Sequence, residues 1–163
     1  MEEIYKEYSY EIYKYLLSLT NDPETSEELL QETFYSAIKN INKFRGESSV
    51  KTWLYSIAKN KYIDYYKKSK KTKEIKIDEC KDIFLLDTSF EEDYTKKEEL
   101  LSVCKKVHTL DEKSKEIFYL RIGMNFSFKE IGKIIGKTEE YSRLIFYRIK
   151  KYIKEECNNE EEK

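Results

Sequence analysis

Apolar residues recur at spacings of three and four over the first part of the chain, and this pattern predicts an amphipathic helix over residues 3–19. The predicted buried stripe consists of Ile4, Tyr8, Ile12, Tyr15, Leu16 and Leu19. Asn21-Asp22-Pro23 is expected to end this helix. A second helix is expected to follow, with Thr25 or Ser26 as its cap and acidic residues in its positive first turn. Its apolar positions are Leu29, Leu30, Phe34, Ala37, Ile38 and Ile41.

A loop and a third helix complete the predicted first domain, residues 1–68. Residues 44–49 interrupt the helical pattern with a glycine and two small hydroxyl residues, which is typical of a loop. The third helix is predicted over residues 50–68. One face holds Trp53, Leu54, Ile57, Ala58, Ile63 and Tyr66, while Lys51, Lys59, Lys61, Lys67 and Lys68 lie on the more exposed surfaces.

Charge replaces the apolar pattern over residues 69–97, apart from the small apolar patch at residues 83–86. This segment is predicted to be a linker. A helical period returns at residues 100–110 and continues through residues 113–122, until Gly123 interrupts it. The second domain is predicted over residues 98–155, followed by an acidic tail at residues 156–163. The fold class is therefore expected to be all-α, with two small helical domains.

The last apolar segments contain a helix-turn-helix pattern. Ser127 and Glu130 form a capping-box sequence at the start of a short helix that runs through residue 135. Gly136 and Lys137 form a predicted tight turn, and Thr138 is placed to cap a long basic helix. A short helix, a glycine turn and a basic second helix are typical of a DNA-reading unit, although a plain helical hairpin has the same pattern.

Composition excludes several other classes of protein. No apolar run approaches the roughly 20 residues that span a bilayer, and no secretory leader is recognisable, so a cytoplasmic location is expected. The three cysteines are widely spaced and are expected to be reduced thiols. Cys104 and His108 have metal-ligand spacing, but no second pair completes a site. We expect neither a metal nor a cofactor, and no catalytic constellation or phosphate loop indicates an enzyme.

Charge is strongly segregated behind the net value of −1. Residues 1–41 have 3 basic and 9 acidic residues (net −6), and residues 42–77 have 11 and 3 (net +8). Residues 78–100 have 3 and 9 (net −6), whereas residues 113–154 have 11 and 4 (net +7). Two such basic blocks can hold a phosphate backbone, although solvated lysine faces would give the same counts.

Three segments in this order resemble the extracytoplasmic-function (ECF) sigma factors, the small two-domain initiation subunits of bacterial RNA polymerase. They are residues 29–34, residues 44–60 together with Asp64, and residues 136–150. The resemblance implies a promoter-specificity subunit that binds the core polymerase through its β and β′ subunits, recognises promoter DNA and helps to open it. It also implies an anti-sigma factor, commonly tethered to a membrane. The alternatives are a free-standing helix-turn-helix regulator and a pure interaction protein.

By this resemblance, the second helix docks on the clamp helices of the largest polymerase subunit. The matching residues are Glu28, Leu29, Gln31, Glu32 and Phe34. The family usually has Asp at the position of Glu28. Leu29 and Phe34 have a second interpretation as core residues.

The loop and the third helix match the family's surface for the −10 promoter element. The matching residues are Phe44, Arg45, Gly46, Ser48, Ser49, Lys51, Trp53, Lys59, Asn60, Lys61, Lys67 and Lys68. Small loop residues permit close approach to a flipped base, and lysines can hold the strand's phosphates. Trp53 matches one member of an aromatic pair used at melted DNA, with Leu54 in place of the other; the alternative for Trp53 is a core anchor. Asn60 has the groups to read adenine, or to hydrogen-bond within the domain.

The last helix matches the family's reader of the −35 element. The matching residues are Thr138, Ser142, Arg143, Phe146, Tyr147, Arg148, Lys150 and Lys151. Arg143 and Arg148 have the fork geometry that suits guanine or phosphate. Leu144 and Ile145 depart from the small polar and basic residues common at these positions, which favours an apolar contact such as a thymine methyl or a partner surface.

Overall fold

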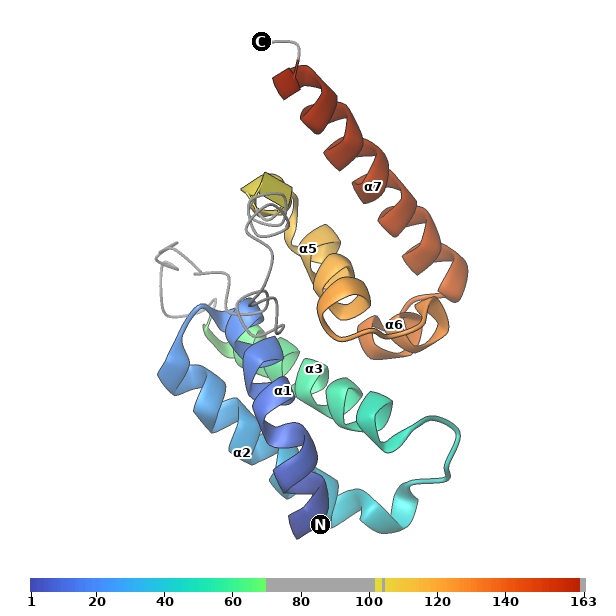
Figure 1. Cartoon of the computed structure of the whole chain (residues 1–163). Helices are drawn as coiled ribbons and strands as arrows, with labels where there is room; N and C mark the ends of the chain where they lie inside the picture. The colour runs from blue at the N-terminus through green and yellow to red at the C-terminus, as the bar shows by residue number, and fades with distance from the viewer. Residues whose placement is uncertain (70–101, 104, 162–163) are drawn as a thin grey trace. The chain divides into compact units, whose positions relative to one another are not determined.

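The computed structural model describes residues 1–69, 102, 103 and 105–161, and all regular structure within them is helical. The helices are α1 (Glu2–Thr20), α2 (Pro23–Asn40), η1 (Ile41–Lys43), α3 (Val50–Ser69), α5 (Glu112–Phe118), the π-helical turn η2 (Tyr119–Gly123), α6 (Phe128–Ile135) and α7 (Glu139–Glu161) (Figure 1). The chain divides into two compact units, one built around α1 to α3 and the other containing α5, η2 and all of α7. The prediction of an all-α protein is confirmed.

The N-terminal unit is a bundle in which α1, α2 and α3 each pack against the other two. Its buried apolar residues are Ile12, Tyr15, Leu16, Leu17, Leu29, Leu30, Phe34, Ala37, Leu54, Tyr55 and Ala58. The rings of Tyr15 and Tyr55 join α1 to α3, with their centroids 5.0 Å apart. Such an aromatic pair contributes about 0.5–1.5 kcal/mol beyond the burial of its area. Ile38 and Ile41, predicted as apolar positions of the second helix, are instead exposed.

The junction between α1 and α2 differs from the sequence prediction. Asn21 adopts a left-handed conformation (φ 54°), and its N–H bonds to the Leu17 carbonyl, which ends α1 as expected. The second helix, however, is capped by Asp22, whose carboxylate accepts the Thr25 N–H at 3.0 Å. Pro23 is the first helical residue, a position where a missing N–H costs nothing. Thr25 and Ser26 therefore lie inside the first turn and are not caps.

The C-terminal unit has a core cluster formed by Val107, Phe118 and Ile149. Partly buried apolar residues pack around it: Val103, Leu110, Tyr119, Ile145, Phe146 and Ile153. The sequence predicts a helical period that continues through residues 113–122. In the structure α5 ends at Phe118, and the single π turn η2 follows it. Helix α5 begins at Glu112 and is capped by Asp111, whose side chain accepts the Ser114 N–H at 3.1 Å.

The predicted capping box and glycine turn are confirmed. The Ser127 N–H donates to Glu130 Oε2 at 2.9 Å, and the Glu130 N–H donates to Ser127 Oγ at 3.3 Å. Gly136 has φ 68°, a conformation that favours glycine. Thr138 Oγ1 accepts the Tyr141 N–H at 3.1 Å and so caps α7. That helix continues to Glu161, so the acidic segment prolongs it through the last described residues.

Several predictions fall outside the described residues. They concern the linker beyond Ser69, the apolar patch at residues 83–86, Cys80, Cys104 and the restart of the helical period at residues 100 and 101. Within residues 1–69, 102, 103 and 105–161, no helix has the length and apolar character needed to cross a membrane. The same residues contain no group of three or more His, Cys, Asp or Glu side chains that could hold a metal ion.

Candidate nucleic-acid and polymerase interfaces

The predicted docking residues of α2 divide into an exposed set and a buried set. Glu28, Gln31 and Glu32 are exposed, which suits a surface for another protein. Leu29 and Phe34 are only 3% and 5% exposed and belong to the core. The Phe34 ring also packs against Tyr5 of α1, with centroids 4.7 Å apart. Leu29 and Phe34 therefore match their second interpretation, as core residues that hold α2 in the bundle.

The loop between η1 and α3 is shaped by its glycine and by a cap. Gly46 has φ 70°, a conformation that strains any residue with a side chain. Ser49 Oγ accepts the Thr52 N–H at 3.1 Å, which makes Ser49 the effective cap of α3. Arg45 and Gly46 are exposed at the tip. Of the predicted loop residues, Ser49 thus has a structural task in addition to any contact with DNA.

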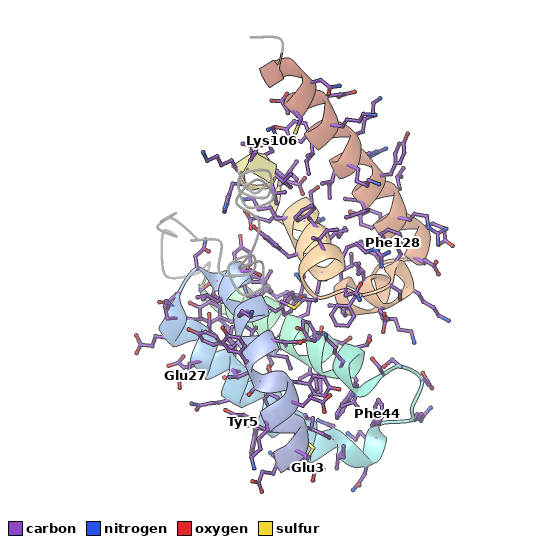
Figure 2. All side chains as sticks on the ribbon, viewed as in Figure 1. Glu3, Tyr5, Glu27, Phe44, Lys106 and Phe128 are labelled. Carbon is purple, nitrogen blue, oxygen red and sulfur yellow. The ribbon has the colours of Figure 1, made fainter. Side chains whose placement is uncertain are left out.

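Two aromatic rings meet at the neck of this loop. The ring centroids of Phe44 and Trp53 are 5.0 Å apart with an interplanar angle of 42° (Phe44 is labelled in Figure 2). Both residues are partly buried. Trp53 is therefore neither a fully buried core anchor nor an isolated exposed wedge, because Phe44 packs against its ring and ties the two ends of the loop together.

The predicted −10 lysines of α3 are not equivalent. Lys51 pairs with Glu11 of α1 at 2.7 Å, and Lys61 pairs with Glu32 of α2 at 3.4 Å. The Lys59 ammonium lies 5.4 Å from the centroid of the Tyr62 ring. By contrast, Asn60, Lys67 and Lys68 are exposed. The exposed group is the better candidate for contact with a DNA strand, since Lys51 and Lys61 already join helices within the unit.

Glu11 and Tyr55 extend the contact at Lys51 into the core, and the sequence pattern did not identify either residue. Tyr55 is fully buried, and burial raises the pKa of its hydroxyl far above the ordinary value of 10.0. The negative charge of Glu11 and a hydrogen bond to its carboxylate raise that pKa further. Tyr55 therefore remains a neutral donor, and Glu11 links α1 to the first turns of α3.

Most of the predicted −35 residues lie on the surface of α7. Thr138, Arg143, Tyr147, Arg148, Lys150 and Lys151 are exposed. Ser142 is a correction: it is 0% exposed, and its hydroxyl donates to the Thr138 carbonyl at 3.2 Å. Phe146 is partly buried, and its ring packs against the unit's core beside Phe118 and Phe128. Ser142 and Phe146 therefore face the inner side of α7, where they support the packing of the helix.

Arg143 makes two defined contacts in the helix-turn-helix. Its guanidinium nitrogen lies 2.5 Å from the carboxylate of Glu139, one turn earlier in α7. Its guanidinium carbon lies 5.7 Å from the ring centroid of Phe128, the first residue of α6. Tyr147 and Leu144 are also exposed, at 66% and 48%. The surface of α7 therefore combines cations with apolar and aromatic groups, a composition suited to base edges as well as phosphates.

Comparison with known proteins defines the class. A family described as Sigma-70 region 2 matches residues 4–72. The RNA polymerase sigma factor YlaC of Bacillus subtilis (strain 168) is 33% identical over 143 residues, covering 83% of this chain and 79% of the relative. The ECF RNA polymerase sigma factor SigM of the same organism is 30% identical over 154 residues, covering 94% and 93%. The chain therefore belongs to the ECF sigma factors, which direct promoter-specific initiation of transcription by bacterial RNA polymerase.

Solved structures agree with this fold. The sigma factor RpoE, in complex with the anti-sigma factor NepR from Bartonella quintana, has a TM-score of 0.68 at 17% identity, covering 95% of this chain and 96% of that one. The protein CnrH, in complex with the cytosolic domain of CnrY, has a TM-score of 0.64 at 16% identity, covering 97% and 87%. Family membership confirms the sigma-factor prediction, which replaces the two alternatives considered from sequence.

Proposed function

We propose that this sigma factor reads −35 duplex DNA with the exposed surface of α7 and engages the −10 element with the loop at residues 44–49 and the exposed side of α3. The observation that carries the proposal is the capped helix-turn-helix, whose second helix has Arg143, Tyr147 and Arg148 exposed. In this motif the second helix enters the major groove, and exposed arginines suit guanine edges and phosphates. The chain acts by binding and performs no bond chemistry itself.

Docking on the core polymerase is proposed for the exposed side of α2. Glu28, Gln31 and Glu32 supply polar and acidic groups there. Tyr35 and Ile38 follow Gln31 at helical spacing and are 60% and 53% exposed. Exposed apolar groups beside carboxylates suit a protein interface, whose centre is usually apolar and whose rim is polar. This work would take place in the cytoplasm, where the polymerase and the promoter DNA are found.

An anti-sigma factor is proposed as a second protein partner. RpoE is bound to the anti-sigma factor NepR and CnrH to the cytosolic domain of CnrY, and both proteins share the fold of this chain. A membrane-tethered partner would release the chain on a signal. Co-purification of the tagged chain from unstressed cells and from cells exposed to a panel of stresses tests this: a partner lost under one of them supports sequestration, and the absence of any partner in every state contradicts it.

The test of the main proposal is transcription with purified core polymerase on a pool of genomic templates. The unmodified chain is expected to direct initiation at a small set of promoters, and Arg143→Ala or Arg148→Ala to weaken initiation by about 1–3 kcal/mol for each lost base contact. Lys113→Ala, which removes an exposed cation from α5, is the matched control and is expected to act like the unmodified chain. Normal promoter selection by both arginine variants would contradict the assignment of α7.

A further inference from the structure

The ring of Phe128 lies at the junction of the two helices in the helix-turn-helix. Phe128 is the first residue of α6, and its ring centroid is 5.5 Å from that of Phe146 in α7 (Phe128 is labelled in Figure 2). The Arg121 guanidinium carbon lies 4.8 Å from the same ring, and its Nη1 donates to the Phe126 carbonyl at 2.8 Å. Phe146 and Arg121 thus fix the ring from two neighbouring segments.

Arg143 is the flexible group that meets this fixed ring. Its side chain is 60% exposed, yet it contacts Phe128 of α6 and Glu139 of α7. An arginine side chain has several rotatable bonds, and the conformational entropy that it loses on binding DNA lowers the affinity. A guanidinium group also stacks well on an aromatic face, and its N–H groups then point outward in the plane of the guanidinium. The contacts therefore restrict Arg143 before DNA arrives, while its outer N–H groups remain at the surface.

We propose that Phe128 is a positioning residue for −35 recognition: its ring holds the Arg143 guanidinium in the orientation that reads a base. Phe128 itself is only partly exposed and touches no DNA in this scheme. The inference rests on the proposed function, since it requires α7 to be the reading helix. Glu139, one turn before Arg143 in α7, also restricts the guanidinium. A phosphate or a base displaces this carboxylate from Arg143 more readily than it displaces an aromatic ring that belongs to another helix.

The experiment uses the full chain bound to core polymerase and a promoter with every single-base substitution in its −35 element. Phe128→Leu keeps an apolar side chain but removes the aromatic face, and it is expected to lower discrimination at the position read by Arg143 by about two- to fivefold. Phe128→Tyr restores the face and is expected to retain discrimination. The Phe128→Leu change should have no further effect on discrimination once Arg143→Ala is present, because its influence passes through that side chain.

The structural control is Phe118→Leu, which shortens a core aromatic whose ring partners are Tyr119 and Phe146. It is expected to lower stability and the total initiation rate without changing base preference. If Phe128→Leu is too unstable to assay, Phe128→Met supplies the same test with an unbranched, flexible side chain that fills irregular core gaps.

Three results would overturn the inference. If Arg143→Ala changes the −35 preference and Phe128→Leu does not, Phe128 has no positioning role and the proposed function stands. If Phe128→Leu changes preference equally with and without Arg143, its effect does not pass through the arginine. An Arg143→Ala protein with unchanged preference would instead remove the proposed role of α7, and this inference with it.

Discussion

The two units carry similar blocks of positive charge but use them differently. In the N-terminal unit, Lys51 and Lys61 have side chains only 27% and 28% exposed, and each pairs with a carboxylate from another helix. In the C-terminal unit, Arg143 and Lys151 are 60% and 67% exposed, and each pairs with a carboxylate on the same helix. Two sequence blocks with similar net charge therefore have different roles in the structure.

The two kinds of salt bridge differ in what DNA must disrupt when it binds. A salt bridge between helices, such as the pair of Glu11 and Lys51, is coupled to tertiary packing. A pair within one exposed helix contributes little, about 0.3–0.5 kcal/mol, and phosphate can replace the carboxylate without disturbing the fold. We infer that the N-terminal block first maintains the bundle and contacts DNA through its exposed members, whereas α7 presents most of its cations to the duplex.

The largest predicted effect tests whether the units are independent. Leu54→Ala, at a position 0% exposed, is expected to destabilise the N-terminal unit by about 2–5 kcal/mol, because it leaves a cavity. Ile149→Ala is expected to do the same to the C-terminal unit, whose core includes that side chain. Amide hydrogen exchange followed segment by segment is the measurement. Loss of protection across both units in either variant would show that they unfold together.

The next prediction compares cations from the two units. Arg148→Ala is expected to weaken promoter binding by the holoenzyme by about 1–3 kcal/mol, since this exposed side chain lies on the proposed reading surface. Lys51→Met is expected to change binding by less than about 1 kcal/mol, because its ammonium already pairs with Glu11. Affinities measured over a series of salt concentrations provide the comparison. Equal losses would erase the distinction drawn between the units.

A smaller effect is expected from Glu11→Gln. The change removes the charged partner of Lys51 and of the Tyr55 hydroxyl, and it is expected to cost about 1 kcal/mol of N-terminal stability, limited by the partial exposure of Glu11. Glu2→Gln is the matched control, since its pair with Lys6 is highly exposed. Urea unfolding of each single variant, of Lys51→Met and of the double variant Glu11→Gln/Lys51→Met completes a double-mutant cycle. A coupling energy near zero between Glu11 and Lys51 would contradict the structural role.

The smallest effect concerns the acid stability of α5. Hydrogen bonding by the Ser114 hydroxyl, opposed by burial and aided by backbone N–H groups, lowers the pKa of Asp111 below its ordinary 3.8. The stabilisation that ionised Asp111 contributes is therefore complete above about pH 4, and it is lost as the pH falls through the pKa of Asp111 in the folded protein. Asp111→Asn keeps a capping side chain that does not titrate. Urea unfolding at pH 6 and pH 3 should show a larger loss for the unmodified protein than for this variant.

Local signals allowed much of the fold to be predicted. The range predicted for the third helix ends one residue short of α3, and the capping box and the Gly136 turn occur where the sequence indicated. These features depend on neighbours within four residues. The start of α2 was wrong because Asn21-Asp22-Pro23 ends one helix and begins the next, and only the backbone geometry shows that both events share this tripeptide.

The candidate sites could be predicted less completely, because burial depends on other helices. Tyr55 becomes interior through Tyr15 and Glu11 of α1, which no pattern within α3 reveals. Ser142 and Phe146 lie among the predicted contact residues in sequence, but the rotation of α7 against its unit turns both inward. The contact between Phe128 and Arg143 was not predicted for a related reason, since the two residues lie fifteen positions apart, across the glycine turn.

The pairing of Phe44 with Trp53 has an optical consequence. Trp53 is the chain's single tryptophan, so its indole emission originates at one place, the neck of the loop at residues 44–49. Any ligand that draws the loop away from α3 separates the two rings and alters the solvent around the indole. The natural protein therefore carries an intrinsic fluorophore that allows loop movement to be followed in real time, without a chemical label, as promoter DNA opens.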